Sequence, residues 1–346
     1  MKRSLSRSGK NQPGAALVIL NPKANHGLGR NLPQQICHEL GLESSQVIVT
    51  KFPYQATILA RRAAQQNIKT IIAVGGDGTI NEILNGIIGF DVRLGIIPTG
   101  TANDLADLYH IPGNISAACT IIKAGQSCDL DVIQVNEWYY CTAGGIGLPC
   151  QVAKIAEAIK KNKMIGKIIL RLLKSGIYTL ALLIALLKNN KQHNPMTINI
   201  NGYSKKINPL WIMIHNQPKL GEKFMVCPGA VNDDGLFDYC LVAKVPSWLK
   251  ILFLSWLVLS GRHFGQPDVS GGAASEIQII AEKPVAFLGD GQIQIPESVF
   301  RIRIVPKALK LIVPAGFRLP VQRNSYTQSL PPNRKKPGDV YALHSS

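Results

Sequence analysis

This chain of 346 residues has few charged residues and no long apolar run. The first feature is not typical of a disordered protein, and the second is not typical of a membrane-spanning one. Charged residues make up 17% of it and hydrophobic residues 46%, a balance typical of a globular protein and not of a disordered one. Two uncharged apolar runs stand out, Ser175 to Leu187 with 13 residues and Ile251 to Gly261 with 11. Because a helix needs about 20 residues to cross a bilayer, neither run predicts a membrane span.

The seven cysteines lack the spacing of a metal finger or of a disulfide framework. They are scattered and odd in number, so we expect reduced core thiols in a cytoplasmic protein. Residues 1 to 14 are basic and polar with no apolar run behind them, which is not the pattern of a secretory signal.

Acidic residues are few, 21 against 38 basic ones, and the excess of +17 is concentrated. Residues 1–14 carry four basic groups and no acid, residues 318–346 carry five and one, and residues 151–191 carry nine and one. We find no helix-turn-helix or single-strand-binding signature and therefore expect no nucleic-acid partner. The stretch from Lys154 to Lys191 interleaves lysine with Ile and Leu, which suits reversible docking on an anionic membrane surface at about 1 kcal/mol per basic group. Packing in a core is the alternative for its apolar positions.

The first part of the chain alternates apolar runs with helical patterns, which predicts an α/β domain with a mainly parallel sheet. The expected strands are 16–20, 47–50, 70–74 and 94–98. After residue 129 the pattern changes to extended segments separated by turn signals, which predicts a β-rich second domain with inserted helices. The expected strands there are 132–135, 197–200, 210–214, 237–242, 277–281 and 300–305. We place the domains at 15–130 and 131–308, between a basic tail at 1–14 and a disordered basic tail at 318–346.

The segment Ile71 to Asn85, IIAVGGDGTINEILN, is the most informative part of the sequence. An apolar strand runs into Gly75 and Gly76 and then opens an amphipathic helix, an arrangement that exposes backbone amides to a phosphate. Thr79 and Glu82 have the spacing of a capping box at the helix start. An ordinary strand-to-helix connection would have the same composition.

A second copy of this plan favours the functional interpretation. Leu94 to Ala106, LGIIPTGTANDLA, has an apolar strand, then Gly100, a capping Thr101, and Asp104 three residues later. Two such corners that end parallel strands can converge on one ligand at the carboxyl edge of a sheet.

Together, GGDGTINE and PTGTANDLA resemble the soluble bacterial diacylglycerol kinase-like lipid kinases. The resemblance runs from about Ala16 to about Val313 and includes Asn21-Pro22, DLDVIQVN, CPGAVNDDGLFD and Asp290-Gly291. It implies a sandwich-like second domain, a last strand near residues 309–317 that returns to the first domain, and an active site in the interdomain cleft. It also implies ATP and Mg²⁺ as cofactors and a lipid as phosphate acceptor.

Similar kinases contact ATP through the first loop and the glycine corners. Carried over, the nucleotide-binding residues are Asn21, Pro22, Lys23, Ala24, Asn25, Thr50, Gly75, Gly76, Asp77, Gly78, Thr79, Ile80, Asn81, Glu82 and Thr101. Asn25 replaces the glycine usual in this loop, and Gly27 and Gly29 are candidates to take over its role.

Carboxylates on separate loops predict one cation site, since hard oxygen ligands suit Mg²⁺. We expect Asp77, Asp104 and Asp131 to meet at one edge of the cleft as a magnesium site, although each alone could be a helix cap or a turn residue. The resemblance implies a structural cation bound by Asp234 with the carbonyls of Val231 and Leu236.

The motif Asp290-Gly291-Gln292 departs from the family's Asp-Gly-Glu, where the proton acceptor is placed. Gln292 cannot take a proton from an alcohol. If the segment is extended, Asp290 lies on the same face two residues away and could serve as base. A loose phosphoryl transition state demands little early proton removal, so we expect Asp290 to suffice.

The sequence thus predicts an ATP- and Mg²⁺-dependent lipid kinase that transfers phosphate to a lipid hydroxyl and visits the inner face of the membrane. The alternatives are an NAD kinase-like enzyme, disfavoured by the second corner, and a non-catalytic lipid- or nucleotide-binding regulator, motivated by Gln292. His263 is expected at the surface, with a place in the cleft as the alternative. A homodimer is left open, and so is the identity of the lipid.

Overall fold

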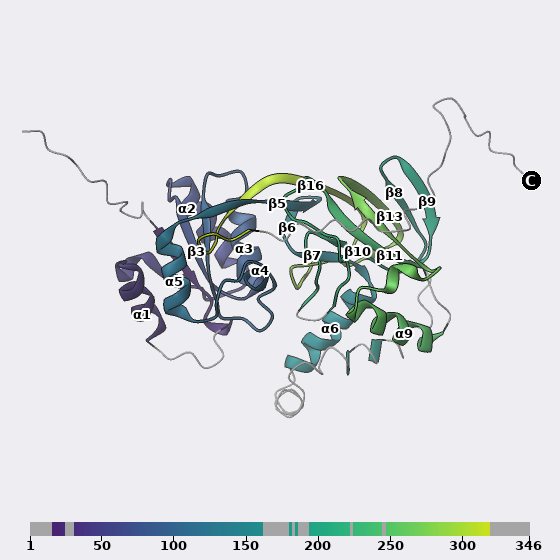
Figure 1. The fold of residues 1–346 in the computed structure, drawn as a ribbon, viewed down its shortest axis with the longest axis horizontal. Coiled ribbons are helices and arrows are strands. Elements are labelled where there is room, and N and C mark those ends of the chain that lie inside the picture. Colours follow the sequence, from purple (N-terminus) through teal and green to yellow (C-terminus); the bar gives the residue numbers. More distant parts are fainter. Residues whose placement is uncertain are drawn as a thin grey trace, which may run out of the picture.

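The computed structural model describes residues 16–24, 31–161, 180–181, 184–185, 194–221, 224–243 and 247–318. These residues form two lobes, and two long strands, β5 (Ser127–Val135) and β16 (Glu297–Ile312), run from one lobe to the other (Figure 1). The first lobe is an α/β unit with parallel strands and the second is an antiparallel β-sandwich. The expected fold class is therefore confirmed. Both expected tails lie outside the described residues, except for Arg318.

The first lobe is built on four parallel strands in the order β2-β1-β3-β4. They are β1 (Ala16–Leu20), β2 (Val47–Val49), β3 (Thr70–Gly75) and β4 (Arg93–Pro98). Every residue of β3 is buried and only the first of β4 is not, because helices cover both faces of the sheet. The helices and short 3₁₀ turns of this lobe are η1 (Pro22–Ala24), α1 (Leu32–Leu40), η2 (Ser44–Gln46), α2 (Gln55–Gln65), α3 (Asp77–Ile87), α4 (Asp104–Leu108) and α5 (Ile115–Ala124).

The last strand joins the lobes because its two halves belong to different neighbours. The first half of β16 pairs antiparallel with β13 (Glu276–Val285), and its end pairs parallel with β4, Lys310 opposite Arg93. The sheet of the first lobe therefore continues through β16 into the second lobe.

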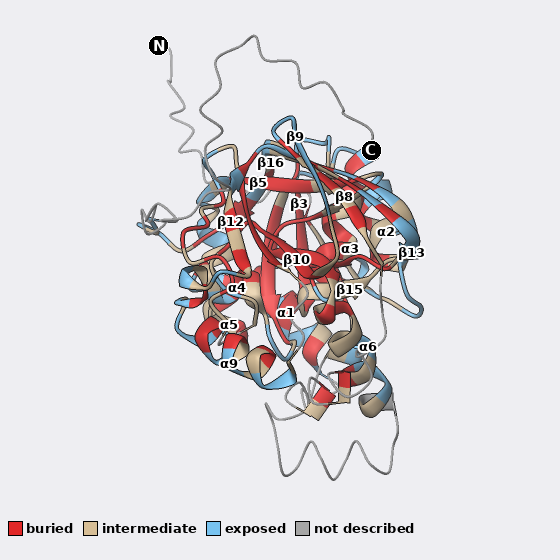
Figure 2. Cartoon of the chain, turned by 90° about the vertical axis from the view of Figure 1, so that its right-hand side faces the viewer, coloured by how far each residue is buried: buried red, intermediate tan, exposed pale blue. Residues whose placement is uncertain are grey.

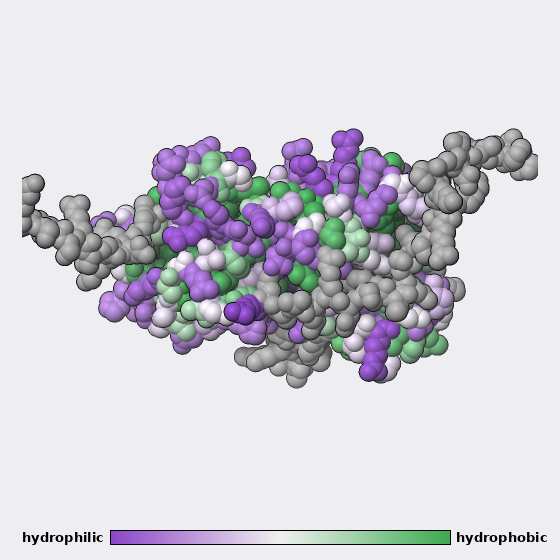
Figure 3. All heavy atoms as spheres, turned by 45° about the horizontal axis from the view of Figure 1, so that its top comes forward, coloured by the Kyte–Doolittle hydropathy of each residue, from purple (hydrophilic) through white to green (hydrophobic). Residues whose placement is uncertain are grey.

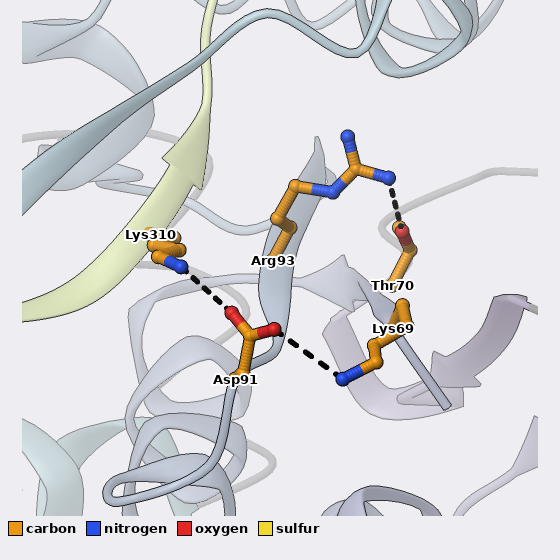
Figure 4. Close-up of polar contacts among 5 residues, drawn as sticks. All are labelled: Lys69, Thr70, Asp91, Arg93 and Lys310. Carbon is orange, nitrogen blue, oxygen red and sulfur yellow. Dashed lines mark hydrogen bonds and ion pairs between the residues drawn. The ribbon is translucent and has the colours of Figure 1, made fainter. Parts of the chain in front are cut away.

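An ion-pair group marks the edge of the sheet where β3 and β4 begin (Figure 4). The Asp91 carboxylate accepts from Lys310 at 2.7 Å and from Lys69 at 3.3 Å, and both pairs are exposed. Arg93 donates to the Thr70 hydroxyl at 3.3 Å. Exposed pairs contribute little to stability, so we assign this group a minor role in holding β16 in place.

The second lobe packs two sheets face to face. The first sheet continues as β16-β13-β8-β9, and the second has the order β12-β11-β10-β7-β14-β15. Buried side chains from the two inner faces, among them Tyr140, Phe237, Phe287 and Phe300, form the core of the sandwich. Figure 2 shows the buried stretches of the strands in red. The remaining strands are β6 (Trp138–Tyr140), β7 (Ala143–Gly147), β8 (Met196–Ile200), β9 (Tyr203–Ile207), β10 (Pro209–His215), β11 (Phe237–Ala243), β12 (Val269–Ala274), β14 (Leu288–Gly289) and β15 (Gln292–Ile293).

Two helices, α6 (Leu148–Lys161) and α9 (Trp248–Leu259), contribute to a further apolar cluster beside the second sheet. Most of the lysine-rich stretch after residue 161, including most of Ser175 to Leu187, lies outside the described residues. The run from Ile251 to Gly261 falls mainly in α9. Among the described residues, no helix combines the length and apolar character needed to cross a bilayer.

Candidate active site

The two glycine corners lie against each other at the carboxyl ends of β3 and β4. A Cβ built on Gly76 would lie 2.9 Å from the Cα of Gly100, and one built on Gly100 would meet the Cα of Gly76 more closely still. The amide of Thr99 donates to the carbonyl of Gly75 at 2.9 Å. Neither corner has room for a side chain, so the pair presents bare backbone beside the N-terminus of α3. A phosphate can approach the main chain closely at such a place.

The loop after β1 joins the first corner through a side-chain contact. Asn21 donates from Nδ2 to the hydroxyl of Thr79 at 3.0 Å, and its amide donates to the Val74 carbonyl at 2.9 Å. The hydroxyl of Thr79 also lies where a side chain on Gly75 would have to go. The structure therefore brings Asn21, predicted from the first loop, next to the glycine pair Gly75-Gly76.

The rest of the first loop lies at the same edge. Pro22 and Lys23 are exposed in η1, with Ala24 half-buried. Thr50 follows β2, and its hydroxyl donates to the Leu20 carbonyl at 3.3 Å, at the end of β1. Asn25 and the glycines expected to replace its role lie outside the described residues.

The expected capping box at the first corner is wrong. Helix α3 begins at Asp77, so Thr79 lies inside its first turn, where its amide donates to the Gly76 carbonyl at 2.9 Å. Glu82 instead accepts from the amide of Ala56 at 3.1 Å, in the first turn of α2. Its carboxylate caps a neighbouring helix because it lies on the face of α3 that packs against α2.

The cap at the second corner is also not the one expected. Thr101 is exposed, and Asn103 precedes α4 with a positive φ of 55°. The Asn103 side chain accepts from the Gly100 amide and donates to the Gly100 carbonyl, both at 3.0 Å. Its own amide donates to Asp77 at 2.9 Å. Asn103 thus fixes the second corner and links it to the first. This residue belongs to the motif PTGTANDLA, but we did not predict a role for it.

Asp77 is the most perturbed carboxylate of the site. Burial raises its pKa to about 7, with further contributions from the negative charges of Asp104 and Asp290. Its Oδ1 atom is out of contact with solvent and has no hydrogen-bond partner among the described residues. A buried carboxylate oxygen that faces two other carboxylates matches the needs of a hard divalent cation, so Asp77 and Asp104 fit Mg²⁺. The Oδ2 atom of Asp104 accepts a hydrogen bond from the amide of Gly221 at 3.0 Å, which fixes this side chain.

Asp131 does not join this pair, which corrects the expected three-carboxylate site. It lies within β5, and its two oxygens accept from the amides of Gly235 at 2.6 Å and Lys307 at 2.8 Å. These backbone contacts hold it against the 231–236 loop. In the described part of the chain, no group of three His, Cys, Asp or Glu side chains is placed to bind a metal.

The 231–236 loop gathers a second negative charge centre. Asp234 accepts from the Leu236 amide at 3.0 Å, and the Asn232 carbonyl accepts from the amide of Asp131 at 2.8 Å. Burial and the charges of Asp131 and Asp234 raise the pKa of Asp233. The negative charges of Asp131, Asp233 and Asp234 therefore lie close together, and Val231 and Leu236 stand at the two ends of this loop.

Asp290 lies in a turn and not in an extended segment, which was the condition for its expected role as base. Asp290 and Gly291 form a two-residue turn between β14 and β15, with φ of 45° and 75°. Its Oδ1 accepts from the amide and hydroxyl of Thr142, at 2.9 and 2.6 Å. Its Oδ2 accepts from Asn81 at 2.9 Å and from the amide of Cys141 at 3.0 Å. Donors occupy both oxygens, so this buried carboxylate positions the residues that contact it.

Gln292 contacts the glycine corner directly. Its Nε2 donates to the carbonyl of Gly78, in the first turn of α3, at 3.0 Å. The amide therefore acts as a donor to backbone, a contact that the family's glutamate could not make while ionised. The hairpin from the second lobe thereby closes on the helix that follows the first corner.

Two residues predicted to contact the nucleotide are buried in other contacts. Ile80 is 1% exposed and belongs to the core of the first lobe. Asn81, also 1% exposed, donates to Asp290 and to the carbonyl of Tyr139. Because only part of a helix start can face a ligand, these two side chains face the protein interior, and contact of their backbone with a nucleotide stays a prediction. We did not predict Thr142 as a partner of Asp290, and no sequence signal indicated it.

His263 is fully buried, so the expectation of a surface position is wrong. A ring nitrogen, Nε2, lies 3.0 Å from the carbonyl of Val226, and burial lowers the pKa of the imidazole to about 4. It stays neutral at physiological pH and belongs to the second lobe's packing.

Comparison with known proteins agrees with this fold and site. Residues 15–135 match the family model "Diacylglycerol kinase catalytic domain", and residues 158–313 match "YegS C-terminal NAD kinase beta sandwich-like domain". A protein of Klebsiella pneumoniae (strain 342) named "Probable lipid kinase YegS-like" is 28% identical over 87% of this chain and 96% of its own length. The "Diacylglycerol kinase" of Staphylococcus aureus (strain JH9) is 29% identical over 80% of this chain and 85% of its own.

Solved structures show the same architecture. The crystal structure of a diacylglycerol kinase from Bacillus anthracis str. Sterne superposes with a TM-score of 0.65 at 21% identity, covering 87% of this chain and 97% of that one. The fold and site define an α/β kinase domain joined to a β-sandwich. The chain belongs to the diacylglycerol kinase-like lipid kinase family, and it is an enzyme of the lipid kinase class.

Proposed function

We propose that this enzyme transfers the γ-phosphoryl group of ATP to a hydroxyl group of a membrane lipid. The contact between Gly76 and Gly100 carries the proposal, because it forms one bare backbone surface from the two family motifs. The α- and β-phosphates of a nucleotide would lie on this surface, near the N-terminus of α3, where unpaired amides and the helix dipole favour negative charge.

Mg²⁺ would be held by Asp77 and Asp104. When bound, it supplies positive charge that neutralises the phosphate oxygens during transfer. The orphaned Oδ1 of Asp77 and its raised pKa support this assignment, because a cation would offset the burial and the neighbouring negative charges that raise the pKa. We propose a second, structural cation at the 231–236 loop, supported by the raised pKa of Asp233 beside Asp131 and Asp234.

In the reaction, the lipid hydroxyl oxygen forms a bond to the γ-phosphorus while the bond from that phosphorus to the bridging oxygen of ADP breaks. The hydroxyl proton passes to solvent after the new bond has formed. This order needs no strong base, since a loose transition state leaves the attacking hydroxyl only weakly acidified. Asp290 serves as a positioning residue that holds Thr142 and Asn81, and Gln292 holds the start of α3.

The lipid acceptor would be presented at the anionic inner surface of the cytoplasmic membrane. The charge of +17 supports this location, because juxtaposed basic groups are attracted to anionic lipids.

Incubation with γ-labelled ATP, Mg²⁺ and a total lipid extract tests the proposal. We expect label in a lipid product and dependence on Mg²⁺. A parallel incubation with NAD separates the NAD kinase-like alternative, for which label would appear in NADP instead. Failure to label any lipid in mixed micelles, with the folded protein, would contradict the proposed function.

A further inference from the structure

Helix α9 (Trp248–Leu259) carries an apolar face that the described residues leave uncovered. Its inner side packs on the second lobe, with Ile251, Leu254, Leu257 and Val258 buried. Its outer side exposes large apolar side chains. These are Trp248 at 59%, Leu249 at 60%, Phe253 at 47%, Trp256 at 64% and Leu259 at 45% exposure.

These five side chains form one continuous surface. Their spacing places them on the same side of a helix with 3.6 residues per turn, opposite the buried positions. The rings of Phe253 and Trp256 stack with centroids 6.1 Å apart. By contrast, the face of the molecule in Figure 3 is largely hydrophilic, with hydrophobic residues in smaller groups. Monomeric proteins rarely expose a contiguous patch of this kind without using it.

The composition of α9 identifies an interfacial helix. It is apolar on all sides, and Lys250 is its single charged residue. Its 12 residues span about 18 Å at 1.5 Å per residue, too short to cross a bilayer. Tryptophan and phenylalanine on the outer side are the residues that favour the boundary between lipid head groups and acyl chains.

Two surfaces could cover this face, a second copy of this chain or an anionic membrane, and charge distinguishes between them. From Lys244 to Gln266 the chain carries three basic residues and no acidic one, and one of the three, Lys250, forms an ion pair with Asp268 just beyond this stretch. Arg262 directly after the helix is exposed, as is Lys154 on α6, whose helix shares the same apolar cluster. Figure 1 shows α6 and α9 on the same side of the second lobe. A second copy of this chain would bring the same basic residues against these, whereas an anionic membrane would complement them.

We propose that α9 is a membrane anchor, lying parallel to a bilayer that contains anionic lipid, with Trp248, Phe253 and Trp256 inserted at the level of the head groups. The proposal rests on the proposed function in one respect, since the lipid acceptor is what brings the enzyme to a bilayer. It assigns that contact to an apolar helix of the second lobe and not to lysines alone.

Co-sedimentation with vesicles of phosphatidylglycerol and phosphatidylcholine tests the proposal on the full chain. The double variant Trp248→Gln/Trp256→Gln removes the two largest exposed side chains, so we expect its vesicle affinity to fall about tenfold or more. Phe253→Gln should weaken binding to a smaller extent. Phe90→Gln is the matched control, because Phe90 is a 37% exposed phenylalanine in the first lobe, and its binding should equal that of the parent.

A second readout reports the depth of insertion. Acyl chains brominated near the head group should quench the fluorescence of the parent protein, and this quenching should be lost in the double variant. Unchanged affinity and quenching in the double variant would overturn the proposal. A parent dimer in sedimentation velocity that the double variant dissociates would also overturn it, because the face would then bind a second copy.

Activity separates this inference from the proposed function. With short-chain diacylglycerol in detergent micelles, where no bilayer is needed, the double variant should turn over at the parent's rate. If the parent phosphorylates no lipid in any form, the proposed function fails while vesicle binding can still be measured. If micellar turnover is normal and vesicle binding ignores α9, the anchor alone is refuted.

Discussion

The side chains of Asn81 and Asp290, 209 residues apart in sequence, meet through a hydrogen bond of 2.9 Å in the buried region between the lobes. Asn81 lies on the helix that follows the first glycine corner, and Asp290 lies in the hairpin turn of the second lobe. This contact, with that of Gln292 to Gly78, couples the nucleotide-side helix to the β-sandwich. The relative position of the two lobes therefore depends on polar contacts at the site itself.

Replacement of Gly100 by alanine should damage the paired corners. The added Cβ would overlap the backbone of Gly76, and the shift needed to relieve it should cost about 1–3 kcal/mol of unfolding free energy. Turnover should fall about a hundredfold, because a displacement of about 1 Å at the phosphate surface misaligns the reactants. Urea denaturation and lipid kinase assays measure both effects. Gly113→Ala is the control, since a Cβ there meets no atom of the described residues within 4 Å, and equal losses in both variants would contradict the argument.

Stability should depend on pH through Asp77 when divalent cations are removed. The folded state raises its pKa from 3.8 to about 7, so the folded protein binds more protons than the unfolded chain between these values. Unfolding free energy should therefore decrease as pH rises from about 4 to about 7, by up to about 4 kcal/mol. Asp77→Asn should remove this slope, and the difference between parent and variant in chelator-containing urea titrations isolates it.

Addition of Mg²⁺ provides the complementary observation. The cation should stabilise the parent more at neutral than at acidic pH, because it competes with the proton for the Asp77 carboxylate. Stabilisation of Asp77→Asn that matched the parent at every pH would show that Mg²⁺ binds elsewhere.

Replacement of Asp290 by asparagine should destabilise the fold more than an ordinary surface change. The amide would place an NH2 group where one of the two oxygens now only accepts, so at least one contact with Thr142, Cys141 or Asn81 must break. We expect a loss of about 2–4 kcal/mol, the range for charged buried hydrogen bonds left unmatched. Asp129→Asn, at an exposed site, is the control and should change stability by under about 0.5 kcal/mol. A fully stable Asp290→Asn protein that had lost only its turnover would favour the proton-acceptor role instead.

Restoring the family's glutamate with Gln292→Glu tests whether this enzyme lacks a base. The carboxylate could no longer donate to the Gly78 carbonyl, so stability should fall by about 1–2 kcal/mol. Turnover should change by less than about tenfold, because early proton removal contributes little to a loose transition state. Initial rates at several pH values provide the measurement. A gain of about a hundredfold or more, the usual contribution of a general base, would show that the chain needs the group it has lost.

Much of the fold follows from local pattern. The four strands of the first lobe were predicted to within a residue at each end, because parallel strands buried on both faces read as continuous apolar runs between glycine and polar turns. The long strands were harder, since β16 is predicted only at 300–305 and near 309–317 but runs unbroken from Glu297 to Ile312. Its alternating pattern is interrupted where it changes partners, which local periodicity cannot anticipate.

The side chains of the site were predicted less well than its backbone. The sequence placed Glu82 correctly in a helix, but it placed Asp131 on a loop, whereas Asp131 lies within β5. It could not say which neighbours the two carboxylates would meet. Glu82 caps a different helix, and Asp131 binds the 231–236 loop, because side-chain partners are chosen by packing between elements distant in sequence.

The sequence by itself determined the glycine corners, the family and the order of the strands, because backbone freedom, capping residues and apolar periodicity act over a few residues at a time. Tertiary structure alone decided that Asp77 keeps an unpartnered oxygen while Asp290 is surrounded by donors, and that α9 turns two tryptophans outward. Charge and burial depend on what folds against each side chain, and those neighbours come from segments up to two hundred residues away.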